Sequence, residues 1–535
     1  MSKAALLAGT AIILAASPVH AQSQKRTQIT PHIEASQVLT ADLQSGDVLT
    51  YSTLGGGVDV SVQSRRVQVQ LSYNYEHRFG YDERIADSDV HSGLARASAN
   101  IMRGVSIDGS AIATRTRSDI RGAAPTLLAG NPDNISQIFS ADAGPTVSTS
   151  IGPVGIGAGY RFGYTKVTTP SFTALPPGEE RLDYYDSSTR HAFNASAGVE
   201  AGRVLPVGIT VSGAVMREDA SQLDQRYQGE FIRGDLVLPV SRELALVGGA
   251  GYEKIHITQR DALVGANGLP VLDSNGRYVT DPASPRRTAY ETDNPLFWDA
   301  GVLWKPSQRT QLEARIGRRY DSWSYTGSLT HQIGPGSGLR VGVYDSIQSF
   351  GRQIGAAVQA LPTQFETSAD TFSNNYNGCV FGSVGNAAGG CLNGVLQSIA
   401  TANYRARGID GVLSFNRGRN RFGIGAGYAN RRFYAPDVGP GVRVDGVTDE
   451  SYYFQAFAAR ALTAESSLSG NIYANYYESG LGNAPGVWGA GANASYTRSF
   501  GRLGASLTGG IFTYDTDGLE SDISAQALLG LGYSF

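Results

Sequence analysis

The sequence has no apolar run long enough to cross a membrane as a helix after its first 21 residues. A transmembrane helix needs about 20 consecutive apolar residues, so a helical membrane protein is excluded. A strong charge of one sign is also missing, because 44 lysines and arginines against 47 acidic residues give a net charge of −3. Nucleic-acid binding therefore has no electrostatic support. We also find no convincing amphipathic helix in the rest of the chain.

Cysteine is scarce: the chain has two, Cys379 and Cys391, in the segment NNYNGCVFGSVGNAAGGCLNG. A structural zinc site needs about four ligands, and this stretch offers too few. In an oxidising compartment we expect a disulfide that clasps the loop. Closing so short a loop stabilises the fold by about 3 kcal/mol in the chain-entropy model.

The first residues, MSKAALLAGTAIILAASPVHAQ, have the three parts of a secretory signal peptide. Lys3 supplies a short positive region, residues 4–16 supply an apolar region, and Val19-His20-Ala21 forms a small-x-small cleavage pattern. We therefore expect residues 1–21 to be removed and residues 22–535 to form the mature protein.

What the mature chain has in abundance is strict alternation. In VQVQLSYNYEHRFGY (67–81), valines, a leucine, tyrosines and a phenylalanine occupy one parity, and mostly polar side chains occupy the other. Alternation with a period of two predicts a β-strand with one apolar and one polar face. About 22 segments of this kind follow one another along the chain.

The connections between these segments sort by length. Short turns are expected at 64–66, 103–104, 152–153, 241–243, 305–308, 416–420, 463–466 and 500–502. Longer polar loops alternate with them, at 118–135, 170–183, 260–294 and 350–402. Short turns at one end and long loops at the other are typical of outer-membrane barrels, whose short turns lie in the periplasm.

In hydrocarbon every backbone polar group needs a partner, so membrane-spanning strands must close on themselves. We therefore predict an all-β fold, a transmembrane antiparallel up-and-down β-barrel of about 22 strands within a range of 18 to 24. Residues 22–535 form this barrel, with long extracellular loops near 260–294 and 350–402.

The chain ends AQALLGLGYSF, and Leu529, Leu531, Tyr533 and Phe535 share one parity. A final alternating strand with a terminal aromatic resembles the signal read by the bacterial barrel-assembly machinery, which assigns that role to Leu531, Tyr533 and Phe535. The mature chain as a whole resembles the outer-membrane β-barrel porins of proteobacteria, and more narrowly the large barrels associated with exopolysaccharide export. This resemblance rests on pattern over the whole mature chain, not on a single motif.

The resemblance implies a location in the bacterial outer membrane and passage of polar solutes, with a role in exopolysaccharide export as the narrower expectation. The implied partners are outer-membrane lipid and lipopolysaccharide, the barrel-assembly machinery, and a polysaccharide or export partner. The alternative is a non-conducting structural or adhesion barrel that acts through its extracellular loops.

The sequence leaves open what fills so wide a lumen. Large barrels of this strand number often carry a separate plug, but the first strand-like segment, PHIEASQVLTADL, begins near residue 31 and leaves no room for a preceding plug of a hundred residues. The loops 260–294 and 350–402 are the candidates. For the clasped second loop, a rigid segment folded into the pore and a solvated surface loop are both open.

The hexapeptide GIGAGY occurs twice, at 155–160 and 423–428. It is not a dinucleotide-binding loop, because the strand continues where that fingerprint requires a helix. Glycines on the inward parity instead thin the wall or let a packed loop approach.

Inward parity on the clean strands predicts a set of polar side chains facing the lumen. They are Gln68, Gln70, Asn74, Glu76, Arg78, Arg96, Asn100, Arg161, Arg190, Glu200, Glu313, Arg315, Arg319 and Asp321. Rings of charged side chains set solute selectivity in channels. The same residues are also what any wet barrel interior requires.

Catalysis has weak support. A nucleophilic hydrolase needs a base bonded to its nucleophile and oriented by a third group, and no stretch places these together; His91 is the least unsuitable candidate. We expect no enzyme activity, no cofactor and no metal.

Overall fold

The computed structural model describes residues 26–81, 87–118, 134–169, 183–367, 372, 378–382, 388–396, 399–436, 444–481, 484–517 and 521–535. The predicted signal peptide, residues 1–21, lies outside them. The first eleven barrel strands are β1 (Arg26–Asp42), β2 (Val48–Gln63), β3 (Val67–Gly80), β4 (Ser88–Met102), β5 (Val105–Arg117), β6 (Ile135–Ile151), β7 (Val154–Thr168), β8 (Ser187–Val199), β9 (Gly208–Ala220), β10 (Gln225–Pro239) and β11 (Leu244–Gln259).

The remaining barrel strands are β13 (Leu296–Ser307), β14 (Thr310–Arg319), β15 (Ser322–Gly334), β16 (Ser337–Gln348), β20 (Asn403–Arg417), β21 (Asn420–Tyr434), β22 (Thr448–Ala461), β23 (Ser466–Ser479), β24 (Val487–Phe500), β25 (Leu503–Thr516) and β26 (Asp522–Ser534). The short β12 (Arg287–Glu291) pairs with β11 alone.

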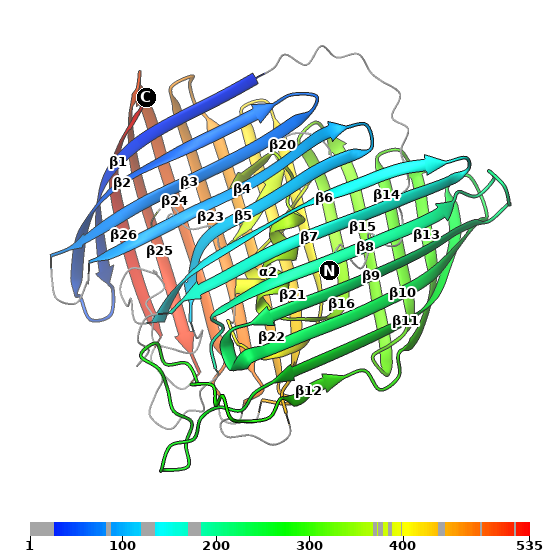
Figure 1. Cartoon of the computed structure of the whole chain (residues 1–535). Coiled ribbons are helices and arrows are strands. Elements are labelled where there is room, and N and C mark those ends of the chain that lie inside the picture. Colours follow the sequence, from blue (N-terminus) through cyan, green and yellow to red (C-terminus); the bar gives the residue numbers. More distant parts are fainter. Residues whose placement is uncertain are drawn as a thin grey trace.

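These strands form one closed ring. Each barrel strand is antiparallel to the next in the chain, and β1 pairs with β26 from His32↔Ser534 to Asp42↔Ser524. The described part of the sheet has 23 strands, and leaving out β12 gives a ring of 22. The predicted class and strand number are confirmed. Figure 1 shows the tilted strands that such closure requires.

The barrel has its apolar face outside and its polar face inside. In β3, Tyr75 and Phe79 are 37% and 40% exposed, whereas the intervening Glu76 and Arg78 are 7% and 2% exposed. A soluble protein arranges these faces the other way round. An apolar band around a closed sheet is the arrangement of a membrane-spanning barrel.

Aromatic rings form two girdles on this outer face. Toward the long-loop end, Tyr452 lies 4.9 Å from Tyr428 and 6.3 Å from Tyr476 between ring centroids, so the row crosses β21, β22 and β23. Toward the short-turn end, Phe415 and Phe422 stack at 4.8 Å. Rings at two heights match the two membrane interfaces.

All eight expected short turns lie at one end of the barrel, between strands that hydrogen-bond to each other. At the long-loop end, the chain reverses between β14 and β15 at Tyr320 and Asp321, which have φ of +53° and +56°. A two-residue hairpin turn of type I′ has positive φ at both positions, and it is usually made with Asn-Gly or Asp-Gly. The dipeptide Tyr320-Asp321 lacks this sequence signal, so the turn was not predicted.

The other elements lie in the connections. They are a 3-10 turn η2 (Gln222–Asp224), helix α2 (Phe350–Gln359), strands β17 (Phe365–Thr367), β18 (Cys379–Gly382) and β19 (Gly389–Cys391), and helix α3 (Asn393–Leu396). In the described part of the chain, no helix has the length and apolar character to cross a membrane. The sequence predicts no amphipathic helix, and α2 shows that this prediction is wrong. The helix has ten residues and lies within a long connection, so its periodic pattern is short.

Candidate functional site: a loop-built plug in the barrel lumen

The connection between β16 and β20 folds into the barrel, and we call its described residues 349–402 the plug. Figure 1 shows α2 within the ring of strands. The apolar side of α2, with Phe350, Ile354 and Val358, packs in one buried cluster with Ile138 of β6 and Val167 of β7. The inward face of the barrel therefore presents apolar side chains to one side of the helix.

The plug spans the lumen from one wall to the opposite one. Helix α2 contacts β5 to β8, whereas β18, β19 and α3 contact β20, β21 and β22. Because β6 and β21 are eleven strands apart in the ring of 22, these walls face each other. Phe372 reaches a third stretch, where its ring lies 5.7 Å from that of Phe512 in β25.

A disulfide between Cys379 and Cys391 joins β18 to β19. It lies directly against the GIGAGY copy in β21, where a Cβ added to Gly425 would be 2.2 Å from Cys379 Sγ. A Cβ on Gly423 would be 2.5 Å from the Phe381 ring. These glycines let the plug approach the wall, as one of the two sequence interpretations held.

Several predicted lumen residues hold the plug by hydrogen bonds to its backbone. Gln70 accepts from Phe365 N at 2.9 Å and donates to Phe365 O at 2.7 Å. Arg96 Nε donates to Leu361 O at 3.1 Å, and Arg190 Nη1 donates to Arg352 O at 3.4 Å. In a side-chain contact, Thr363 Oγ1 donates to Gln68 Oε1 at 2.8 Å.

The start of α2 is fixed on β9. Ser349 is the N-cap: its Oγ accepts from Arg352 N at 3.1 Å and donates to Glu218 Oε2 at 2.6 Å. Arg352 Nε lies 3.4 Å from the same Glu218 carboxylate, and Arg352 Nη2 donates to Asn403 at 2.9 Å. A carboxylate at a helix N-terminus is favourable because of the helix dipole.

The loop 260–294 lies over the long-loop rim, where it contacts the end of β7 and the residues just before β8. Arg277, 4% exposed, donates to Val167 O at 2.7 Å and pairs with Asp186 at 3.2 Å. Tyr278 N donates to Asp183 Oδ1 at 3.0 Å. Burial raises the pKa of Asp183 to about 7, although hydrogen bonds from Tyr278 and Gln222 oppose this shift.

A second stretch of lumen wall holds an ion network of its own. Arg315 Nη1 lies 2.9 Å from both Asp235 and Asp299, and Arg315 Nε lies 2.6 Å from Glu313. Arg233 pairs with Asp235 and Asp299 at 2.7 Å each. Among the residues that the structure describes, every bond of these five side chains stays within β10, β13 and β14. We call this stretch the bare wall.

Three of the predicted residues form part of such wall networks. Glu313 and Arg315 belong to the bare wall, and Arg319 pairs with Glu253 of β11 at 2.5 Å. Sequence reasoning missed Arg233, Asp235 and Asp299, although Arg233 and Asp235 share a parity in EFIRGDLVL.

The other predicted side chains are also accounted for in β3, β4 and β7. Glu76 and Arg78 pair at 2.7 Å, and Asn74 donates to Glu34 of β1. Arg161 lies 3.6 Å from both Asp108 and Asp142. Asn100 is exposed in β4, near its short turn.

The lumen positions predicted for Glu200 and Asp321 are wrong. Glu200 lies in the turn after β8 ends at Val199, where it pairs with Arg203 at 3.1 Å. Asp321 lies in the hairpin turn between β14 and β15. In both cases the alternating parity was carried past the end of the strand, and parity has no meaning in a turn.

The remaining candidates lie on the outer face. His91 Nδ1 is 2.8 Å from Tyr73 Oη beside the long-loop girdle. In the described ranges, no three His, Cys, Asp or Glu side chains are arranged so that they could hold a metal ion. Leu531, Tyr533 and Phe535 are 53%, 37% and 61% exposed at the short-turn rim. Their role as an assembly signal stays a prediction.

Comparison with known proteins adds little detail. No protein-family model matches the chain, and neither does any curated protein. Among solved structures, the ferric-catecholate import receptor Fiu from E. coli K12 (closed form) is 12% identical with a TM-score of 0.44, over 96% of this chain and 82% of that one. The FrpB iron transporter from Neisseria meningitidis (F5-1 variant) is 10% identical with a TM-score of 0.43, over 95% and 82%. The siderophore receptor PirA from Acinetobacter baumannii is 11% identical with a TM-score of 0.39, over 96% and 81%. The fold assignment therefore rests on the strand register itself.

Proposed function

We propose that the chain is a bacterial outer-membrane transport barrel for polar solutes, and that the plug controls passage through its lumen. The observation that supports this is the way the plug is held. Hydrogen bonds from lumen side chains such as Arg96 and Gln70 meet its backbone. Each such bond contributes about 1 kcal/mol net, and these bonds act together with the apolar cluster that buries α2 against the wall.

The polar side chains of the lumen wall suit the passage of polar solutes when the plug moves. The bare wall presents three carboxylates and two arginines, and these stay within the wall rather than bonding to the described plug residues. Rings of fixed charge of this kind select among solutes in channels.

Removing the plug tests the proposal directly. Gln348 and Tyr404 are cross-strand partners, so residues 350–402 can be replaced by a short Gly-Ser linker without separating β16 from β20. We expect the refolded variant to conduct steadily in a planar bilayer, and the full chain to conduct rarely. Deleting only the exposed hairpin tip at 265–269 is the matched control, for which we expect no change.

Folding of each variant is checked by heat-modifiable mobility on a gel. A folded plug-less barrel that remains silent in the bilayer would sink the transport proposal and favour the non-conducting barrel that acts through its loops. The narrower role in exopolysaccharide export follows from the sequence resemblance alone. Block of the plug-less conductance by an acidic exopolysaccharide, with no block by a neutral dextran of equal size, would support it.

A further inference from the structure

The lipid-facing side of the barrel has two hollows at its long-loop girdle. The first has a volume of about 800 Å³ and lies over β10, β11 and β13. Its outward-pointing walls are Ile232, Tyr252, Leu296 and Trp298, of which Leu296 is 70% exposed. Its floor is made of small residues, including Gly234, where an added Cβ would meet nothing within 4 Å. The hollow has the apolar lining that acyl chains need.

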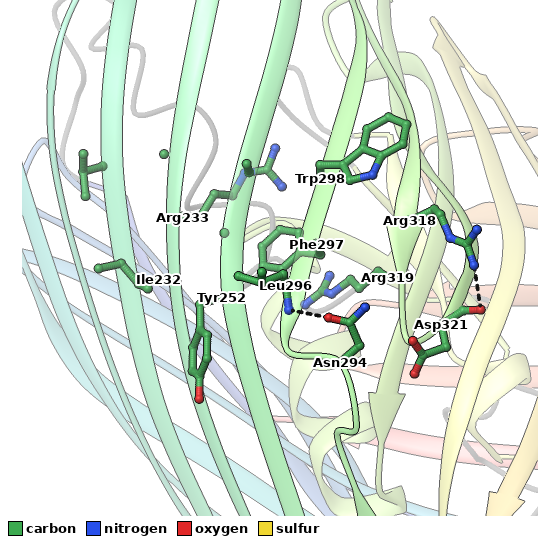
Figure 2. Close-up of a pocket in the computed structure, with 14 residues that line it drawn as sticks. Ile232, Arg233, Tyr252, Asn294, Leu296, Phe297, Trp298, Arg318, Arg319 and Asp321 are labelled. Carbon is green, nitrogen blue, oxygen red and sulfur yellow. Dashed lines mark hydrogen bonds between the residues drawn. The ribbon is translucent and has the colours of Figure 1, made fainter.

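The rim of this hollow is polar. Figure 2 shows Arg318 and Asp321 on one side and Ile232 and Tyr252 on the other. Arg318 is exposed, donates to Asp321 O at 3.3 Å, and makes no ion pair with any described residue. Asn294 accepts from Leu296 N at 3.3 Å, which leaves its amide N–H groups to donate.

Arg318 is also held at the height of the girdle. It lies between Trp298 and Trp323 as cross-strand partner of both, and the two indole rings are 6.1 Å apart. Tryptophans mark the level of lipid headgroups. A guanidinium at that level suits bidentate contact with a phosphate.

The second hollow also lies at the long-loop girdle, but over other strands and with a different rim. It lies over β16 and β20 to β24 and is lined by Tyr428, Tyr452, Phe454 and Trp488, with Gly411 among its small residues. Its lining includes no cation. The two hollows therefore differ in charge rather than in apolar character.

We propose that the first hollow binds a phosphorylated, acylated glycolipid of the outer leaflet, the lipid A part of lipopolysaccharide. Acyl chains fill the apolar hollow, a phosphate contacts Arg318, and the Asp321 carboxylate and the Asn294 amide take sugar hydroxyl groups. The choice of lipid A rests on the proposed outer-membrane location, because the hollow lies at the long-loop, extracellular end of the barrel. Phosphatidylglycerol, which also offers a phosphate and hydroxyl groups, is the competing ligand in the test.

The test is native mass spectrometry of the full refolded chain in detergent with lipid A, dephosphorylated lipid A or phosphatidylglycerol. We expect Arg318→Gln to weaken lipid A binding about tenfold, because a charge-assisted hydrogen bond is lost. Removing the phosphates from lipid A is expected to have the same effect on the wild type and no further effect on Arg318→Gln.

A second pair of variants separates the hollow from lipid in general. Gly234→Leu fills the first hollow and Gly411→Leu fills the second, and both positions face lipid with room for a side chain. We expect Gly234→Leu to reduce lipid A binding severalfold and Gly411→Leu to leave it unchanged. Unchanged binding by Arg318→Gln, equal loss in both leucine variants, or equally tight phosphatidylglycerol binding would each overturn the proposal.

Discussion

The two GIGAGY segments have the same sequence in different surroundings. In β21 the middle glycine, Gly425, lies against the disulfide, and its added Cβ would be 2.2 Å from Cys379 Sγ. In β7 the atom nearest to a Cβ added at the equivalent Gly157 would be Ser196 Oγ, 3.1 Å away, followed by Val147 O at 4.0 Å. The first glycine makes room for another part of the chain, and the second needs only the rotation of one side chain. The same local sequence therefore serves two different structural purposes.

The same contrast holds for whole stretches of the lumen wall. On the walls that meet the plug, Arg96 and Gln70 direct their polar groups to plug backbone. On the bare wall, Arg315 directs its guanidinium to carboxylates of its own and neighbouring strands. Both are arginine-rich polar faces, so composition alone does not separate a docking surface from a self-paired wall.

The largest effect on stability is expected on the bare wall. Arg315→Ala removes ion pairs to Asp235, Asp299 and Glu313 at once, and breaking a buried pair in this way costs about 3 kcal/mol. We expect this loss in the free energy of unfolding measured by urea titration in detergent micelles. Arg217→Ala, which removes an exposed pair with Asp219, should cost less than about 1 kcal/mol. Equal losses would contradict the distinction between buried and exposed pairs.

The next effect compares the two hexapeptides. Gly425→Ala forces the disulfide away from β21, and overpacking of this kind costs about 2 kcal/mol. We expect the plug to loosen and single-channel openings in a planar bilayer to become frequent. Gly157→Ala should leave the conductance unchanged, and similar behaviour of the two variants would mean that the plug does not rest on β21.

A smaller effect is expected from a single plug contact. Arg96→Ala removes the bond to Leu361 O, worth about 1 kcal/mol, and this corresponds to about fivefold more time in the conducting state. Arg65→Ala, at an exposed turn residue, is the control. An opening probability equal to that of the control would show that this bond does not hold the plug closed.

The last comparison concerns the pH dependence of stability. The pKa of Asp183 is raised by burial to about 7 in the folded chain, above its ordinary value of 3.8. Between about pH 4 and 7 the unfolded chain loses this proton and the folded chain keeps it, so the free energy of unfolding falls as pH rises and levels off above pH 7. Asp183→Asn should remove this component of the slope in urea titrations. Identical slopes for the two proteins would contradict the assignment.

Much of the fold was predictable from local pattern. Alternation in segments such as 67–81 indicates which side chains face lipid, because successive side chains of a strand point to opposite faces. The predicted disulfide partners are joined in the structure. The errors occur where alternation stops. Glu200 and Asp321 lie in turns, and α2 lies in a connection where neither the strand period of two nor the helix period of about 3.6 lasts long enough to be recognised.

By itself, the sequence determined the strand class, the approximate strand number, the two faces of the wall and the lengths of the connections, because each depends on neighbours a few residues away. Only the tertiary structure decided that the plug fills the lumen, that Gln70 meets Phe365, and that Arg315 meets Asp235. Those contacts join residues 295 and 80 positions apart. They depend on strand register and ring closure, which no local pattern encodes.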